Sequence, residues 1–145
     1  MPVPIKHVRP KKFPFLISGR WRLLLAPFGV TEERAFVQVG ERELRVCFGP
    51  LFDYRFPLAA VETVKPTRWP LWAGIGPRVN FRGMVAFIGA YEKAVEVRFK
   101  ERQRLRMVVP VPCDRLIVSL EHPEALIAAL EKWPGTTAEA PRKAA

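Results

Sequence analysis

Alternation of apolar and polar residues with a period of two is the feature that most constrains the fold of this chain. It recurs in residues 35–39, 44–48, 95–99, 105–109 and 116–120. Side chains of a β-strand point alternately to opposite faces, so this period predicts strands with one face in a core. Gly40-Glu41 separates the first two segments, and a glycine first in a two-residue turn is typical of a β-hairpin.

Further strands are expected at residues 52–56 and 60–65, and in the continuous apolar run 84–90. Between residues 15 and 25 the apolar side chains again recur at period two around Gly19, which predicts one long strand with a bend. Many strands joined by short turns indicate an antiparallel sandwich or barrel, so the fold class is mainly β.

The last regular segment has a helical period instead. His122 stands at the cap position and Pro123 at the first helical position, and an apolar face follows, made of Leu126, Ile127, Leu130 and Trp133. Pro134-Gly135 ends the helix. One amphipathic helix after a run of strands is expected to close the open end of the curled sheet.

Length and composition predict a single domain. Of the 145 residues, 1–12 are expected to form a basic flexible arm, 13–134 the domain, and 135–145 a disordered tail. The longest apolar run, residues 84–91, has the length of a strand, so no membrane-spanning helix is expected. The N-terminal region lacks the pattern of a cleaved signal peptide, and we expect a cytoplasmic protein.

Enzymatic chemistry finds little support in the sequence. Cys47 falls in a strand pattern and Cys113 beside a proline in an expected turn, without a C-x-x-C motif, so we expect neither metal nor disulfide. His7 and His122 are the two histidines, in the basic arm and at the helix cap, and no serine lies in a G-x-S-x-G motif. We therefore predict no catalytic residue and no cofactor.

The order of the predicted elements resembles the bacterial pleckstrin-homology-like (PH-like) domains. The residues that carry the likeness are Phe48-Gly49 at the end of the first hairpin, FPLAAVETV at 56–64, GIGPR at 74–78, VEVRF at 95–99 and VSLEHPEALIAAL at 118–130. The resemblance covers roughly residues 31–133. It implies a barrel of two antiparallel sheets with about seven to nine strands, capped by one C-terminal α-helix, and a binding module without catalysis. His122 departs from the aspartate that usually caps the family's helix.

The charge of the chain points to anionic partners. The formal net charge is +10 and the pI is near 10.3, which favours contact with anionic lipid or nucleic acid. Lys12, Arg20 and Arg22 resemble the loose pattern of Lys, spacer and Arg-x-Arg in phosphoinositide-binding members of the PH-like family, and with Lys11 they are a candidate lipid-headgroup site. A solvated strand face is the favoured alternative. No zinc finger, helix-turn-helix or RNA-recognition motif accompanies the charge, so nucleic acid is the less favoured partner.

A long loop at residues 68–83 contains a second candidate site. Its Gly74-x-Gly76 piece lacks the context of a phosphate-binding loop. Tryptophans interleaved with arginines suit a membrane interface, and the residues concerned are Arg68, Trp69, Trp72, Arg78 and Arg82. A loop folded back over the domain is the favoured alternative, since tryptophan is mostly buried, and the glycines would then form a bend or bulge.

A basic hairpin is the third candidate. With a turn at residues 101–103, Lys100 would face Arg104 and Arg98 would face Arg106. Opposed like charges destabilise a sheet, so an anionic partner could compensate, as could solvent, salt and Glu96 or Glu101. Together these features predict a non-enzymatic binding or adaptor module peripheral to the anionic cytoplasmic membrane face. The alternatives are a module that binds an acidic protein partner and a non-specific nucleic-acid binder.

Overall fold

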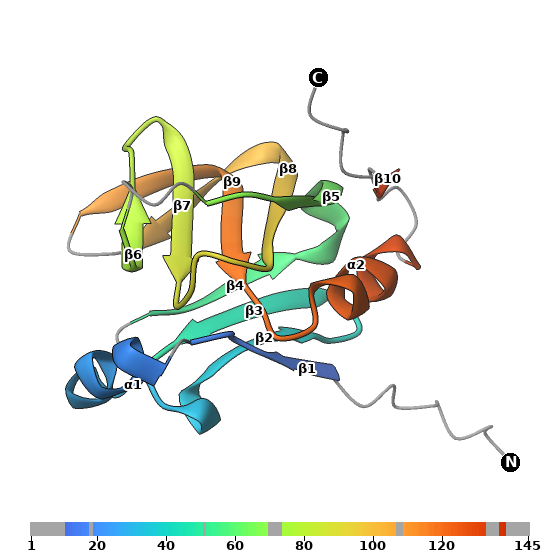
Figure 1. Ribbon diagram of the computed structural model, residues 1–145. Helices are drawn as coiled ribbons and strands as arrows, with labels where there is room; N and C mark the ends of the chain where they lie inside the picture. The colour runs from blue at the N-terminus through green and yellow to red at the C-terminus, as the bar shows by residue number, and fades with distance from the viewer. Residues whose placement is uncertain are drawn as a thin grey trace, which may run out of the picture.

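The structure, a computed structural model, describes residues 11–17, 19–50, 52–69, 74–106, 109–132 and 137–138. It is mainly β, with two separate sheets and one C-terminal helix, α2 (Figure 1). The first sheet has the strand order β1-β2-β3-β4 and the second the order β10-β5-β8-β9-β7-β6. The sheets do not close on each other.

The first sheet is antiparallel throughout. Its strands are β1 (Lys11–Pro14), β2 (Ala35–Val39), β3 (Glu43–Phe48) and β4 (Asp53–Pro57). The predicted hairpin is confirmed, and Gly40 donates its N–H to the carbonyl of Glu43 at 2.9 Å across the turn. Lys11 and Lys12, which the sequence assigned to a flexible arm, belong to β1 and pair with Val39 and Gln38.

The second sheet is mixed, so the prediction of two antiparallel sheets is wrong for this half. Its strands are β5 (Val61–Thr67), β6 (Gly76–Val79), β7 (Gly83–Ile88), β8 (Ala94–Arg106), β9 (Pro110–Ser119) and β10 (Thr137–Ala138). β7 pairs with β9 in parallel, and so does β10 with β5. Thr137 and Ala138, expected in a disordered tail, therefore add to the edge of the sheet.

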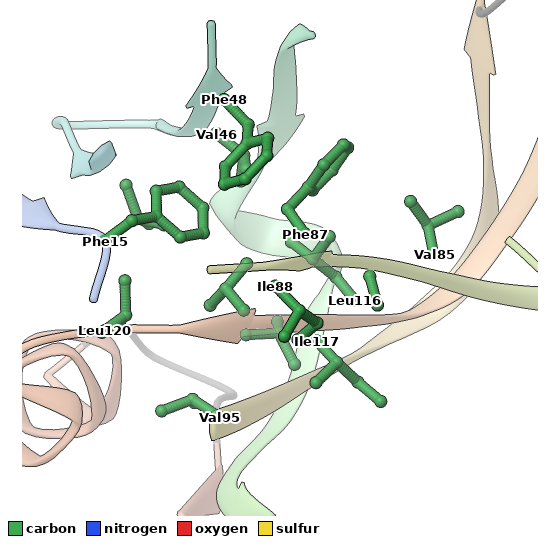
Figure 2. Close-up of a cluster of buried hydrophobic side chains, with 14 of the residues drawn as sticks. Phe15, Val46, Phe48, Val85, Phe87, Ile88, Val95, Leu116, Ile117 and Leu120 are labelled. Carbon is green, nitrogen blue, oxygen red and sulfur yellow. The ribbon is translucent and has the colours of Figure 1, made fainter. Parts of the chain in front are cut away.

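Apolar side chains of both sheets form one core. Phe87 of β7 is fully buried and meets three aromatic rings of the first sheet and its loops, at centroid distances of 5.8 Å to Phe48, 5.6 Å to Phe52 and 6.1 Å to Tyr54. Figure 2 shows Phe15 and Phe48 directed toward Phe87 and its neighbours. Burying such rings supplies most of the attraction between the sheets.

Residues 15–17 connect the two sheets. Phe15 donates its N–H to the carbonyl of Ala35 at 3.1 Å, and Leu16 donates to that of Ser119 at 2.9 Å. The hydroxyl of Ser119 donates to the Leu16 carbonyl at 3.1 Å and accepts from the Gly89 N–H at 2.8 Å. These bonds satisfy the fully buried hydroxyl of Ser119 and hold residues 15–17 against both sheets.

The two helices lie at opposite ends of the domain (Figure 1). α2 (Pro123–Glu131) is confirmed: His122 is the N-cap residue, and Leu126 and Leu130 are fully buried near β5. The long strand predicted for residues 15–25 is wrong, because Gly19–Leu25 form helix α1. Trp21 and Leu25 are spaced i and i+4, which also suits a helix with one face on the core.

Short 3-10 helices complete the fold: η1 (Ala26–Phe28), η2 (Glu32–Arg34) and η3 (Leu58–Ala60). β8 continues to Arg106, so the predicted turn at residues 101–103 is wrong. Its partner along this length is β9, with Arg104 opposite Pro112 and Arg106 opposite Pro110. Cys113, expected in a turn, is a fully buried residue of β9.

Candidate functional site

The loop after β5 is tied down at both of its described ends. The Trp69 side chain is 5% exposed, and its indole N–H donates to the Gly74 carbonyl at 2.7 Å. The Arg78 guanidinium donates to the Ile75 carbonyl at 2.9 Å. Gly74 has a φ of +82°, and a Cβ there would lie 2.7 Å from that guanidinium, so glycine is required at this bend. The Trp69 side chain is therefore packed against the domain and has almost no surface exposed for contact with a membrane.

Trp72 lies outside the described residues, whereas Arg68 is exposed. The basic residues Lys12 and Arg22 of the first candidate site and Arg78 of the second lie on separate elements of the fold. Lys12 lies over the Phe36 ring on the outer face of the first sheet, and Arg78 is on β6 of the second sheet. Arg22 is on α1, where its Nε donates to the Ile17 carbonyl at 3.2 Å.

Lys11 is exposed on β1, and Arg20 belongs to α1. Two cations lie over the Phe36 ring. The Lys12 Nζ is 4.6 Å from the ring centroid, and the Arg45 Cζ is 5.3 Å from it. Arg45 makes two hydrogen bonds with Asp53, at 2.9 and 2.6 Å. The hydrogen bond from Arg45 lowers the pKa of Asp53 below its ordinary value, and the same bond raises the pKa of Arg45. On this face, therefore, Arg45 is already paired with a carboxylate and Lys12 lies over an aromatic ring.

Glu96, which the sequence analysis considered only as one possible compensation for the basic hairpin, pairs with three basic residues of the second sheet. Its side chain is 4% exposed and lies within 3.3 to 3.4 Å of three cations, those of Lys65, Arg98 and Arg115. Arg98 stands directly opposite Arg115 on the neighbouring strand, so the carboxylate separates two like charges. Arg98 is on β8 with Glu96, but Lys65 and Arg115 come from β5 and β9, which are distant in sequence, so no local pattern predicts the whole cluster.

Farther along β8, Lys100, Arg104 and Arg106 are exposed. The Tyr54 hydroxyl donates to the Arg106 carbonyl at 3.2 Å and ties the end of the strand to the first sheet. Burial raises the pKa of this tyrosine. Val109, just before β9, is 51% exposed. The end of the β8–β9 ribbon thus presents an exposed apolar side chain, and Arg106 precedes it by three residues in the sequence.

The β6–β7 turn presents a second apolar side chain. Phe81 is 61% exposed and has a φ of +58°, a conformation that few residues with a large side chain adopt. The Asn80 side-chain oxygen accepts from the N–H groups of Arg82 and Met84 at 2.8 and 2.9 Å and stabilises the turn. Arg102 donates to the Arg82 carbonyl and to Asp114, each at 3.3 Å. The turn is therefore fixed to β8 and β9.

Leu23 of α1 is the third exposed large apolar residue and has 82% of its side-chain surface in water. Leu23, Phe81 and Val109 are the large apolar residues most exposed in the part of the chain that the structure describes. Each has an arginine close to it in sequence: Arg22, Arg82 and Arg106 respectively. We call Phe81 and Val109, with their arginines Arg82 and Arg106, the apolar-basic end.

The two parts of the apolar-basic end, the β6–β7 turn and the end of the β8–β9 ribbon, lie at one end of the second sheet. β7 and β9 run in parallel, with Gly83 opposite Cys113, so the turns that precede both strands fall at this end. α1 lies at the other end of β7, because Ile17, just before α1, bridges to Gly89 (Figure 1). Of the predicted site residues, Arg82 and Arg106 are part of the apolar-basic end, whereas Lys11, Lys12 and Arg22 are not.

Within the described residues, no group of three or more His, Cys, Asp or Glu side chains is placed to hold a metal ion. The same residues contain no helix long and apolar enough to cross a membrane. Burial raises the pKa of the Cys113 thiol to about 12 and also raises that of Cys47. No protein family, curated protein or solved structure matches the chain.

Proposed function

We propose that this protein is a non-enzymatic binding module that attaches to an anionic membrane surface through the apolar-basic end. The observation that carries the proposal is that two strongly exposed apolar residues, Phe81 and Val109, lie at one end of the second sheet, each with an arginine close to it in sequence. Scattered exposed apolar residues are common on protein surfaces, but their association with cations is the pattern of a peripheral membrane contact.

Two forces act together in such a contact. Apolar side chains that enter the headgroup region leave water and gain roughly 25 cal/mol for each Å² of apolar surface. Arginines near the surface of an anionic leaflet gain about 1 kcal/mol each, and their guanidinium groups pair with lipid phosphates. The net charge of +10 adds a long-range attraction that brings the domain to the surface.

The PH-like barrel is the fold that we propose to underlie this activity. The strand order along the chain and the C-terminal helix α2 support it. The parallel pair β7–β9 and the two separate sheets are departures from that fold. Because a fold of this kind hosts many unrelated ligands, the membrane proposal rests on the exposed residues and not on the resemblance.

Co-sedimentation with vesicles tests the proposal. The protein is mixed with phosphatidylcholine vesicles, with or without phosphatidylglycerol, at low and physiological salt, with single-stranded DNA as competitor. We expect binding to anionic vesicles that persists at physiological salt and resists the DNA. Replacing Phe81 and Val109 by serine should weaken binding by roughly tenfold or more and leave its salt dependence unchanged.

The matching charge variant, Arg82→Gln with Arg106→Gln, should weaken binding and also reduce its salt dependence. Lys132→Gln removes one positive charge just after α2, at the other end of the domain, and should have a small effect. Unchanged binding by the variant with serine at both Phe81 and Val109 would refute the proposal. Transfer to DNA, or loss at physiological salt, would also refute it and would favour a nucleic-acid or acidic protein partner.

A further inference from the structure

The exposed arginines of β8 differ in whether a carboxylate engages them. Arg98 and Arg102 each bond to a carboxylate of the second sheet, at 3.4 and 3.3 Å respectively. Among the described residues, no ion pair or hydrogen bond engages the side chain of Arg104 or Arg106. The guanidinium groups of this pair are therefore available to an anion from outside the chain.

Arg104 and Arg106 lie on the outer face of the β8–β9 ribbon. Leu105 between them is 3% exposed and belongs to the core, so the arginines on either side of it project outward. Their Cα atoms are roughly 7 Å apart, since they are two residues apart along one strand. Both side chains are long enough to bring their guanidinium groups to one anion placed between them.

The neighbouring strand leaves the donors of this pair unused. In the register of β8 and β9, the residues opposite Arg104 and Arg106 are Pro112 and Pro110 respectively. A proline side chain neither donates nor accepts a hydrogen bond. The Tyr54 hydroxyl donates to the Arg106 carbonyl at 3.2 Å, so the backbone is fixed where the two arginines stand.

We propose that Arg104 and Arg106 together bind the phosphate monoester headgroup of a membrane lipid, the chemistry of phosphatidic acid. A phosphate monoester carries a charge of about −1.5 to −2 at pH 7 and has three acceptor oxygens, so it matches two adjacent guanidinium groups in charge and in hydrogen bonding. A phosphodiester lipid such as phosphatidylglycerol has a single negative charge and matches them less well. The inference rests on the proposed function, because Arg106 belongs to the apolar-basic end.

Vesicles of matched surface charge test the headgroup. The full chain is co-sedimented at physiological salt with phosphatidylcholine vesicles that contain phosphatidic acid, or enough phosphatidylglycerol to give the same zeta potential. We expect roughly fivefold tighter binding to the phosphatidic acid vesicles. Glycerol 3-phosphate, which has the same phosphate monoester without acyl chains, is added at the concentration of the accessible phosphatidic acid and should not displace the protein. Displacement would overturn the assignment to a membrane lipid.

A variant of unchanged net charge tests the residues. Arg104→Lys with Arg106→Lys keeps both positive charges but removes the paired N–H donors of the guanidinium groups, so it should bind the two vesicle types equally. The matched control is Lys100→Gln, which removes a positive charge from the same strand where its pairing with β9 is interrupted. It should weaken binding to both vesicle types and keep the preference. All three positions are exposed, so each variant is expected to fold.

The outcomes separate this inference from the proposed function. Equal binding of the unsubstituted protein to the two vesicle types would overturn the phosphate monoester assignment and leave membrane attachment standing. Binding to neither type would refute membrane attachment as well. A preference for phosphatidic acid that survives the double lysine substitution would overturn the assignment to Arg104 and Arg106.

Discussion

Replacing Glu96 by glutamine is predicted to destabilise the domain far more than the same change at Glu101. Both residues are on β8 and both substitutions remove one negative charge. Glu96 is 4% exposed and pairs with Lys65, Arg98 and Arg115, whereas Glu101 is exposed. Glutamine keeps the shape of the side chain, so the comparison isolates the charge.

The magnitude follows from the exposure of the three cations, which is 29% for Lys65, 48% for Arg98 and 40% for Arg115. Ion pairs with partners so open to solvent contribute roughly 0.5 to 1 kcal/mol each. Losing all three, and leaving Arg98 opposite Arg115, should cost about 2 kcal/mol in the free energy of unfolding. In a domain of this size that lowers the thermal midpoint by roughly 6 °C.

Urea unfolding followed by circular dichroism measures the difference in the free energy of unfolding between the two variants. It is measured at low salt and again in about 1 M sodium chloride, where the Debye length is only about 3 Å. We expect the gap between Glu96→Gln and Glu101→Gln to shrink at high salt. Equal stability of the two variants at low salt would refute the reasoning, because the three ion pairs would then contribute nothing.

Three further predictions concern the core, the cysteines and the loss of stability at low pH. Phe87→Ala should cost about 3 to 5 kcal/mol in urea unfolding, and Phe81→Ala, at an exposed site, less than about 0.5 kcal/mol; similar costs would contradict the core assignment. Cys113, fully buried with a pKa of about 12, should react with a thiol reagent only after denaturation, and fast labelling of the native protein would contradict its burial. The Arg45 bond lowers the pKa of Asp53, so the ionised carboxylate stabilises the folded state above its pKa in the unfolded chain, near 4, and this stabilisation is lost as pH falls through the folded pKa. Asp53→Asn should therefore make the free energy of unfolding less dependent on pH between about pH 2 and 5. An unchanged pH dependence would contradict the Arg45 bond.

Local patterns predicted the elements whose partners are near in sequence. The β2–β3 hairpin follows from the period of two and from Gly40, and α2 follows from Pro123 and the spacing of Leu126 and Leu130. In these segments local propensity and tertiary burial agree.

Other elements depend on contacts that a local pattern does not contain. A parallel and an antiparallel strand have the same side-chain period, so the pairing of β7 with β9 is invisible to it. Residues 19–25 alternate like a strand, yet the spacing of Trp21 and Leu25 fits a helix equally well, and α1 forms there. At the end of β8, charged residues resemble a turn although the strand continues to Arg106.

The candidate site was predicted in part. The arginines were visible as charge, and Arg82 and Arg106 belong to the end that carries Phe81 and Val109. Exposure itself was not visible, because Phe81 falls in a loop that was expected to fold back over the domain and Val109 in a predicted strand. The turn residues around Phe81, Asn80 and Gly83, are the one local signal that could have identified it as a tip.

The most direct test of membrane attachment is to find which end of the domain meets the lipid. An environment-sensitive fluorophore is placed at Phe81→Cys and, as the matched site, at Ala128→Cys on the exposed side of α2, since both native cysteines are buried. On addition of anionic vesicles, we predict a blue shift and quenching by lipid-borne quenchers at position 81 and no change at position 128. A response at position 128 alone, or at neither position while the protein co-sediments, would contradict the account.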